Sequence, residues 1–181
     1  MFNDRFGLTK AVIEGRKTMT RRIVKGETPL GNWEETEKYA HYKVGEVIAI
    51  AQSYNDVIDE WKKGYIKGFY FSSLKDRAGM TNKMFVRSEK MPHHIKITNI
   101  RVERLQDISD EDCLREGVRL WEDADSEYKS NPLGKLYEIV GVWDGYKSPR
   151  EAFAALIDKV SGKGTWESNP YVWVYEFELT D

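Results

Sequence analysis

The chain has 181 residues and a formal net charge of −2, from 28 basic and 30 acidic side chains, so we expect one domain over 1–181 with a sizeable core. The charge balance excludes a protein that coats duplex nucleic acid, since such a protein carries a large basic excess. The single cysteine excludes an intramolecular disulfide. Without an apolar leader or a run near ~20 apolar residues, we expect a cytoplasmic protein with no membrane partner.

The first predicted element is a short helix over 8–14, in which Leu8 and Val12 share a face. The glycine that follows suits a left-handed helix end. It begins an eight-residue basic segment that holds four cationic side chains and two threonines: Gly15-Arg16-Lys17-Thr18-Met19-Thr20-Arg21-Arg22.

Two side chains of the basic segment, Lys17 and Thr20, carry possible chemistry. A regular strand would place them on opposite faces, so a site that uses both requires a turn or an irregular start to the strand. The alternative is a solvated basic loop, since runs of charge usually face water.

The next part of the chain predicts a loop over 24–43 and then a strand over 47–51. The strand segment is continuously apolar, which is typical of a strand buried on both faces. Residues 53–90 are mixed and are expected to form an insertion. Within it, Val57, Ile58 and Trp61 fit a short amphipathic helix, and 69–71 fit a strand.

The longest predicted strand covers 94–105. Its apolar residues change phase by one position near 98–99, which predicts a β-bulge. A helix over 109–116 follows, with Ser109 as its N-cap. Glu116 then lies in the last turn, where the helix dipole disfavours the charged carboxylate. A carboxyl group in such a position is a candidate for proton transfer. The alternative is a solvated surface glutamate.

A second insertion is expected over 118–147, because this stretch shows no clear period. Ser148 and Pro149 then begin a strong helix that Gly162 ends. The strict alternation over 171–179 predicts a final strand. The loop before it, 164–170, contains Trp166, which no periodic apolar stripe explains.

Metal and cofactor sites are not predicted. His93 and His94 are adjacent, so on a strand they point to opposite faces, and Cys113 has no neighbouring ligand in sequence. No nucleophile elbow or glycine-rich phosphate loop is present. What remains is a hydroxyl beside a lysine, which can replace a Ser-His pair when burial or nearby cations keep the amine neutral.

The basic segment, followed by Val44-Gly45-Glu46-Val47, resembles the signature of the ASCH domain family, whose domains are similar in fold to RNA-binding PUA domains. The resemblance covers nearly the whole chain, with 53–90 and 118–147 as additions. Segments 84–92, 100–105 and 166–174 resemble a longer branch found in bacteria and their phages. The resemblance to the ASCH family implies an α+β fold: a small PUA-like β-barrel of mixed or antiparallel strands with short flanking helices and two insertions.

The family includes an amidohydrolase that removes the acetyl group from N4-acetylcytidine. Its catalytic residues fall on three positions of this chain. By this resemblance, Thr20 would be the nucleophile, Lys17 its base, and Glu116 the acid and base for the leaving amine. The two insertions depart from the compact enzyme, so a shared substrate does not follow.

The sequence therefore leaves three candidate functions. The first is binding of RNA or a modified nucleoside by the basic segment and nearby aromatic rings. The second is hydrolysis of an N4-acylated cytidine-type nucleoside, and the third is a protein-interaction module of phage origin. The sequence leaves the oligomeric state open. The residues expected to bind ligand are Arg16, Thr18, Arg21, Arg22, Trp166, Asn169 and Tyr171.

Overall fold

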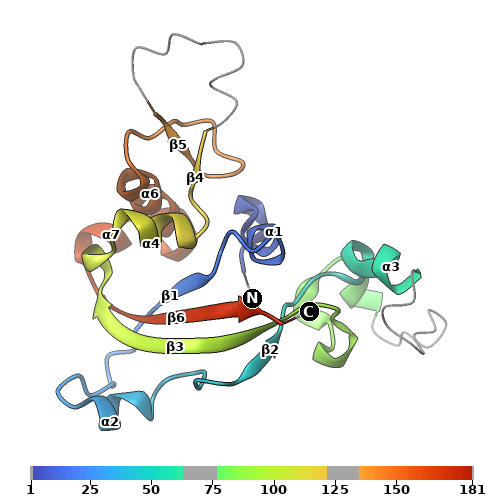
Figure 1. Ribbon diagram of the computed structural model, residues 1–181, viewed down its shortest axis with the longest axis horizontal. Coiled ribbons are helices and arrows are strands. Elements are labelled where there is room, and N and C mark those ends of the chain that lie inside the picture. The colour runs from blue at the N-terminus through green and yellow to red at the C-terminus, as the bar shows by residue number, and fades with distance from the viewer. Residues whose placement is uncertain (1, 63–76, 122–134, 181) are drawn as a thin grey trace.

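The computed structural model describes residues 2–62, 77–121 and 135–180, without the side chains of 59–62 and 77 (Figure 1). They form a mixed α+β structure around a curled, antiparallel four-stranded sheet. Its strands occur in the order β1-β6-β3-β2, so β1 and β2 are the edges of a half-barrel. The strand bounds are β1 Met19–Ile23, β2 Val47–Ala49, β3 His94–Arg104 and β6 Tyr171–Leu179.

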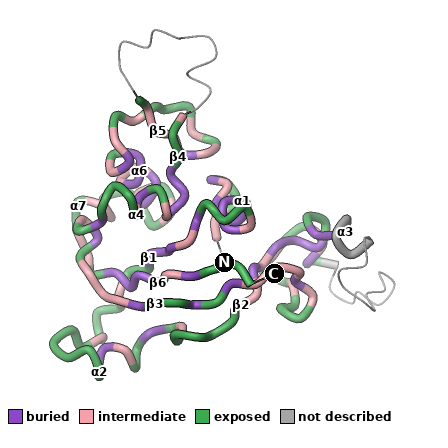
Figure 2. The backbone as a smooth tube through the Cα atoms, viewed as in Figure 1, coloured by how far each residue is buried: buried purple, intermediate pink, exposed green. Residues whose placement is uncertain are grey.

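Strand β6 is central because it pairs with β1 on one side and β3 on the other. The predicted alternation is confirmed, and it sends apolar side chains to both faces of the sheet. Val172 and Val174 join one hydrophobic cluster, whereas Trp173, Tyr175 and Phe177 join another. The strand therefore separates two cores, as its buried middle shows in Figure 2.

The predicted bulge in β3 is also confirmed. Its register with β6 shifts between Ile97 and Asn99, while the pairing is regular on either side. An extra residue of this kind bends a strand and increases its twist. The bulge therefore helps to curl the sheet.

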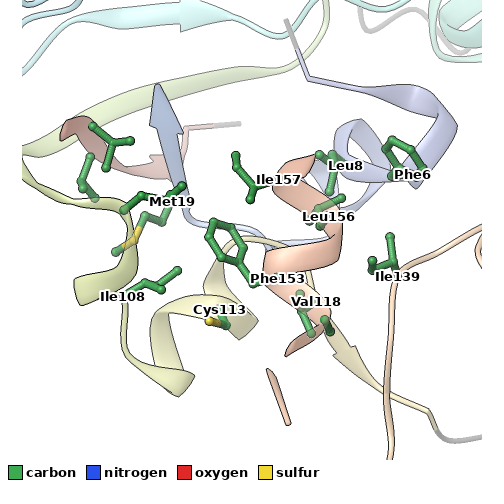
Figure 3. Close-up of a cluster of buried hydrophobic side chains, with 14 residues drawn as sticks. Phe6, Leu8, Met19, Ile108, Cys113, Val118, Ile139, Phe153, Leu156 and Ile157 are labelled. Carbon is green, nitrogen blue, oxygen red and sulfur yellow. The ribbon is translucent and has the colours of Figure 1, made fainter. Parts of the chain in front are cut away.

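Helices cover one face of the sheet (Figure 1). They pack against β1 and β6 through a cluster that includes Met19, Cys113 and Phe153 (Figure 3). The helices on this side are α1 Leu8–Ile13, α4 Asp110–Arg115, α6 Pro149–Ser161 and α7 Thr165–Ser168. Short 3-10 turns cover Asp4–Phe6, Arg77–Met80, Lys83–Phe85, Ser88–Lys90 and Leu105–Asp107.

Three predicted helix signals are confirmed. The Ser109 hydroxyl accepts from the Asp112 amide at 3.1 Å, and the Ser148 hydroxyl accepts from the Glu151 amide at 3.1 Å. Each satisfies one of the amides that the first turn of a helix leaves unpaired. Gly15, with φ +71°, follows α1 in the left-handed conformation.

Two predictions in the first half of the chain are wrong. The run 47–51 is not a strand buried on both faces: β2 covers only Val47–Ala49, and Val47 is 56% exposed because β2 is an edge strand. The expected loop 24–43 contains helix α2 Trp33–Glu37, whose first turn is capped by the Asn32 side chain. That cap and the acidic residues after it are the signal that was missed.

The expected insertions stay predictions, with part of their structure now described. The short helix expected in 53–90 is present as α3 Tyr54–Lys62, whereas the strand expected at 69–71 lies outside the described residues. In 118–147, β4 Arg119–Leu120 pairs with β5 Tyr137–Glu138. No helix in the described part of the chain has the length and apolarity needed to cross a membrane.

Candidate functional site

The basic segment turns before it becomes a strand, as a site using Lys17 and Thr20 requires. The Lys17 amide donates to the carbonyl of Ala11 at 2.9 Å, and the Thr18 amide donates to the carbonyl of Arg115 at 3.0 Å. Regular pairing with β6 begins only at β1. Lys17 therefore projects from a turn fixed to α1 and α4, and Thr20 projects from the edge strand.

A buried ion pair joins the basic segment to the end of α4. The Lys17 amine donates to Glu116 Oε2 at 2.6 Å and to the Glu116 carbonyl at 2.7 Å. Their side chains are only 2% and 6% exposed. The alternative readings, a solvated loop and a surface glutamate, are wrong for these two residues.

Gly117 follows Glu116 in a backbone conformation that favours glycine. Its φ of +107° is one that L side chains rarely adopt. A Cβ here would lie 2.9 Å from Leu8 Cδ2 and 3.6 Å from Lys17 Cδ. A side chain at this position would therefore crowd Leu8, whereas its distance to the lysine stem is an ordinary van der Waals contact.

The environment lowers the pKa of Lys17. Burial is the largest cause, because it disfavours the charged ammonium. Glu116 opposes this effect, while the nearby cations Arg22 and Arg21 add to it. A lysine with a lowered pKa can supply the neutral amine that a general base needs.

Arg21 is the second cation on Glu116. Its guanidinium donates to Glu116 Oε1 at 3.1 Å, to Glu103 Oε1 at 2.6 Å and to Asp112 Oδ2 at 3.1 Å. Burial lowers the pKa of Arg21, but these carboxylates outweigh burial and raise it. Glu116 therefore keeps a cationic partner when Lys17 loses its proton.

A wider charge cluster surrounds this contact. Arg101 donates to Asp112 Oδ2 and to Glu103 Oε2, each at 2.9 Å. Arg101 and Arg115 also both bind Glu176. The cluster thus contains four cations and four carboxylates: Lys17, Arg21, Arg101, Arg115, Glu103, Asp112, Glu116 and Glu176.

Sequence reasoning missed five members of this charge cluster. One signal was available: Arg101 and Glu103 alternate with apolar residues along β3, so they share a face of a strand that is otherwise buried. The partners of that face could not be read from the sequence, because they come from β1, β6 and α4. The five residues are Arg101, Glu103, Asp112, Arg115 and Glu176.

A cavity of about 520 Å³ lies beside the buried pair. Lys17, Thr20 and Glu116 all line it, so the structure brings the three predicted catalytic residues to one cavity. Helix α6 supplies an apolar wall. Other lining residues come from the N-terminus and from 81–84, and the 2.7 Å ion pair between Lys83 and Asp4 joins these two segments.

The predicted binding residues of the basic segment divide into two pairs. Arg21 and Arg22 line the cavity, although the guanidinium of Arg21 is occupied by carboxylates. Arg16 and Thr18 do not line it. Arg16 pairs with Glu14 at 2.6 Å on the surface, and Thr18 accepts from Arg115 Nε at 3.1 Å.

The other three predicted binding residues do not line this cavity, and each has a structural contact near the start of β6. The Trp166 ring packs edge-on to Phe153 at 6.2 Å. The Asn169 side chain accepts from the Gln106 amide at 2.9 Å, with the asparagine in the left-handed conformation. The guanidinium of Arg104 lies 3.9 Å from the centre of the Tyr171 ring.

Two further observations concern metals and thiols. Within residues 2–62, 77–121 and 135–180, no group of three His, Cys, Asp or Glu side chains could hold a metal ion. Cys113 is buried in the helix-side core, and burial raises the pKa of its thiol to about 12. The groups that line the cavity include the Lys17 amine, the Thr20 hydroxyl and the Glu116 carboxylate.

Comparison with known proteins finds no matching family model, no matching curated protein and no matching solved structure. The likeness to ASCH domains stays a prediction from the sequence motifs. The fold and site define the chain as an α+β protein with a half-barrel sheet and a buried lysine–glutamate–arginine cluster beside a cavity.

Proposed function

We propose that the protein is an amidohydrolase that removes the acyl group from an N-acylated nucleoside of the N4-acylcytidine type. The observation that carries the proposal is the 2.6 Å contact between the buried Lys17 amine and Glu116, at a cavity that Thr20 also lines. The volume of this cavity, about 520 Å³, lies within the range of small-molecule sites. The substrate class comes from the resemblance to the ASCH amidohydrolase.

The first half of the reaction forms an ester with Thr20. Neutral Lys17 takes the hydroxyl proton, and Thr20 Oγ1 attacks the amide carbon to form a tetrahedral intermediate. The proton then passes from the Lys17 ammonium to Glu116 and from Glu116 to the amide nitrogen. The C–N bond breaks, the amine leaves, and the acyl group stays on Thr20.

The second half releases the acid. A water molecule attacks the ester carbon while the Glu116 carboxylate takes its proton. The bond from carbon to Thr20 Oγ1 breaks, and that oxygen takes up the proton, which passes from Glu116 through Lys17. The reaction consumes one water and yields one carboxylic acid and one amine, and the enzyme returns to its starting state.

Burial favours this assignment over a simple phosphate-binding loop. A simple phosphate-binding loop presents its cations at the surface, but Arg21 is buried against three carboxylates, and Arg16 pairs with Glu14. The 4% residual exposure of Glu116 suits proton transfer in a water-poor site. Binding of an RNA through the basic segment alone is therefore the weaker proposal.

The test is turnover of N4-acetylcytidine by the whole protein, followed as release of cytidine. We expect Thr20→Val, Lys17→Met and Glu116→Gln each to lower kcat by at least about 100-fold, the scale of a general acid–base contribution. Arg16→Ala is the matched control from the same segment and should keep full activity. Wild-type inactivity on N4-acylated cytidines, or full activity of Thr20→Val, would refute the proposal.

A further inference from the structure

A second cavity lies on the other side of β1, in a groove between that strand and the 24–43 segment. We call it the aromatic groove. Its volume is about 570 Å³, and its lining includes Arg22, Lys25, Tyr39, Tyr42, Trp173 and Tyr175. None of the predicted catalytic residues lines it.

We propose that the aromatic groove is a binding site for a nucleotide, with the base held against tyrosine rings and the phosphate held by Arg22 and Lys25. The link to catalysis rests on the proposed function. In a strand whose acylated base enters the catalytic cavity, the groove would hold the neighbouring nucleotide. The substrate would then be an acylated base within a short single strand.

The aromatic rings form a buried floor and an accessible rim. Trp173 and Tyr175 stack with centroids 6.3 Å apart, and both are at least 95% buried. Tyr42 meets Tyr175 edge-on at 5.3 Å. Tyr39 is 55% exposed, so its ring is available to a ligand. Base–aromatic stacking needs such an open ring face on a fixed support.

The charges of the groove favour an anion. Arg22 and Lys25 contribute two positive charges, and Glu27 contributes one negative charge. His41 also lines the groove and packs edge-on against Tyr42 at 4.5 Å. The groove is therefore net positive even though the chain as a whole is slightly acidic. A planar ring that carries a phosphate matches both its aromatic and its cationic parts.

The aromatic groove and the catalytic cavity meet at Arg22, which lines both. A narrow cleft of about 30 Å³ is lined by Thr20, which also lines the catalytic cavity, and by Tyr42 and Tyr175, which also line the aromatic groove. No base passes through such a cleft. The two cavities thus suit two separate rings joined by a flexible backbone, as in consecutive nucleotides.

The binding test uses the wild-type chain and three probes: cytidine, cytidine monophosphate and a short oligocytidine. Titration calorimetry should show binding of the two phosphate-bearing probes and weaker binding of cytidine. Tyr39→Ala should weaken that binding by about 5- to 150-fold, the loss of one stacked base, while Tyr39→Phe should retain it. Trp143→Ala is the matched control, because Trp143 is a 96% exposed ring that does not line the groove.

Two results would overturn the aromatic-groove proposal. One is equal affinity of wild type and Tyr39→Ala for both phosphate-bearing probes, and the other is no binding of either. Tighter binding of the oligonucleotide than of the monophosphate would identify a strand as the natural ligand. Equal binding of the two would support a nucleotide site but reject the link to a strand.

The kinetic test separates this proposal from the proposed function. With acetylated cytidine inside an oligonucleotide, Tyr39→Ala should raise KM and leave kcat unchanged, whereas both should be unchanged with the free nucleoside. Hydrolysis of the free nucleoside with no effect of Tyr39→Ala on the oligonucleotide would reject the groove alone. Nucleotide binding without any hydrolysis would reject the proposed function and leave the groove standing.

Discussion

Removal of Glu116 should destabilise the protein far more than removal of Lys17. Glu116→Gln leaves the Lys17 ammonium buried without a carboxylate, and breaking a buried pair from one side costs about 3–5 kcal/mol. We expect the lower end, about 3 kcal/mol, because the Glu116 carbonyl still accepts from Lys17 at 2.7 Å and the amine can lose its proton. Lys17→Met should cost only about 1 kcal/mol, since Arg21 still pairs with Glu116.

The contribution of Lys17 to the free energy of unfolding should also depend on pH, in a direction that its pKa fixes. The pKa of Lys17 is lowered by folding, so between that lowered value and the ordinary value of 10.5 the unfolded chain binds more protons than the folded one. The contribution of Lys17 to the free energy of unfolding therefore rises with pH through this window. The stability of wild type relative to Lys17→Met should rise as pH approaches 10.5.

Urea unfolding followed by tryptophan fluorescence measures both effects. Glu14→Gln is the matched control: it breaks a contact of the same 2.6 Å length, with Arg16, but on the surface, where such pairs contribute less than about 1 kcal/mol. A Glu116→Gln variant no less stable than Glu14→Gln would refute the reasoning. The reasoning would also be refuted if the free energy of unfolding of wild type, relative to that of Lys17→Met, fell as pH rises.

Three further predictions concern the supports of the site. Gly117→Ala should lower stability because its Cβ would lie 2.9 Å from Leu8 Cδ2 at a strained φ, and it should lower turnover because a backbone shift there moves the adjoining Glu116; Gly162→Ala, with a similar φ of +114° and open space, should lower stability alone. Ser109→Ala and Ser148→Ala should each cost about 1 kcal/mol of stability in urea unfolding, but only Ser109→Ala should also reduce turnover, because its helix carries Glu116. Cys113 should resist thiol alkylation in the folded protein at neutral pH, because burial raises its pKa to about 12; fast labelling would contradict its buried position.

The parts of the fold that the sequence predicted are those with a local signal. The bulge near 98–99 follows from a phase change within one strand, and the helix at Pro149–Ser161 follows from its cap and its end. The prediction for 47–51 failed because an apolar run does not tell an edge strand from a central one. That distinction depends on the sheet order, which no local pattern records.

The candidate site shows the same limit. Lys17 and Thr20 stand three residues apart in an unusual basic segment, and Glu116 ends a well-signalled helix, so each was recognisable. Trp166 was assigned to ligand binding because no apolar stripe explained it, but its ring packs against Phe153. The aromatic groove was not predicted, because Tyr39 lies in a segment that carried no periodic pattern.

The most direct test of the central claim is a search for an acylated enzyme. Wild type is mixed with N4-acetylcytidine, quenched with acid during turnover, digested and examined by mass spectrometry. We predict one added acetyl group on the peptide that contains Thr20, and none in Lys17→Met. Turnover at an undiminished rate by Thr20→Val, with no acetyl group on this peptide in wild type, would contradict the account.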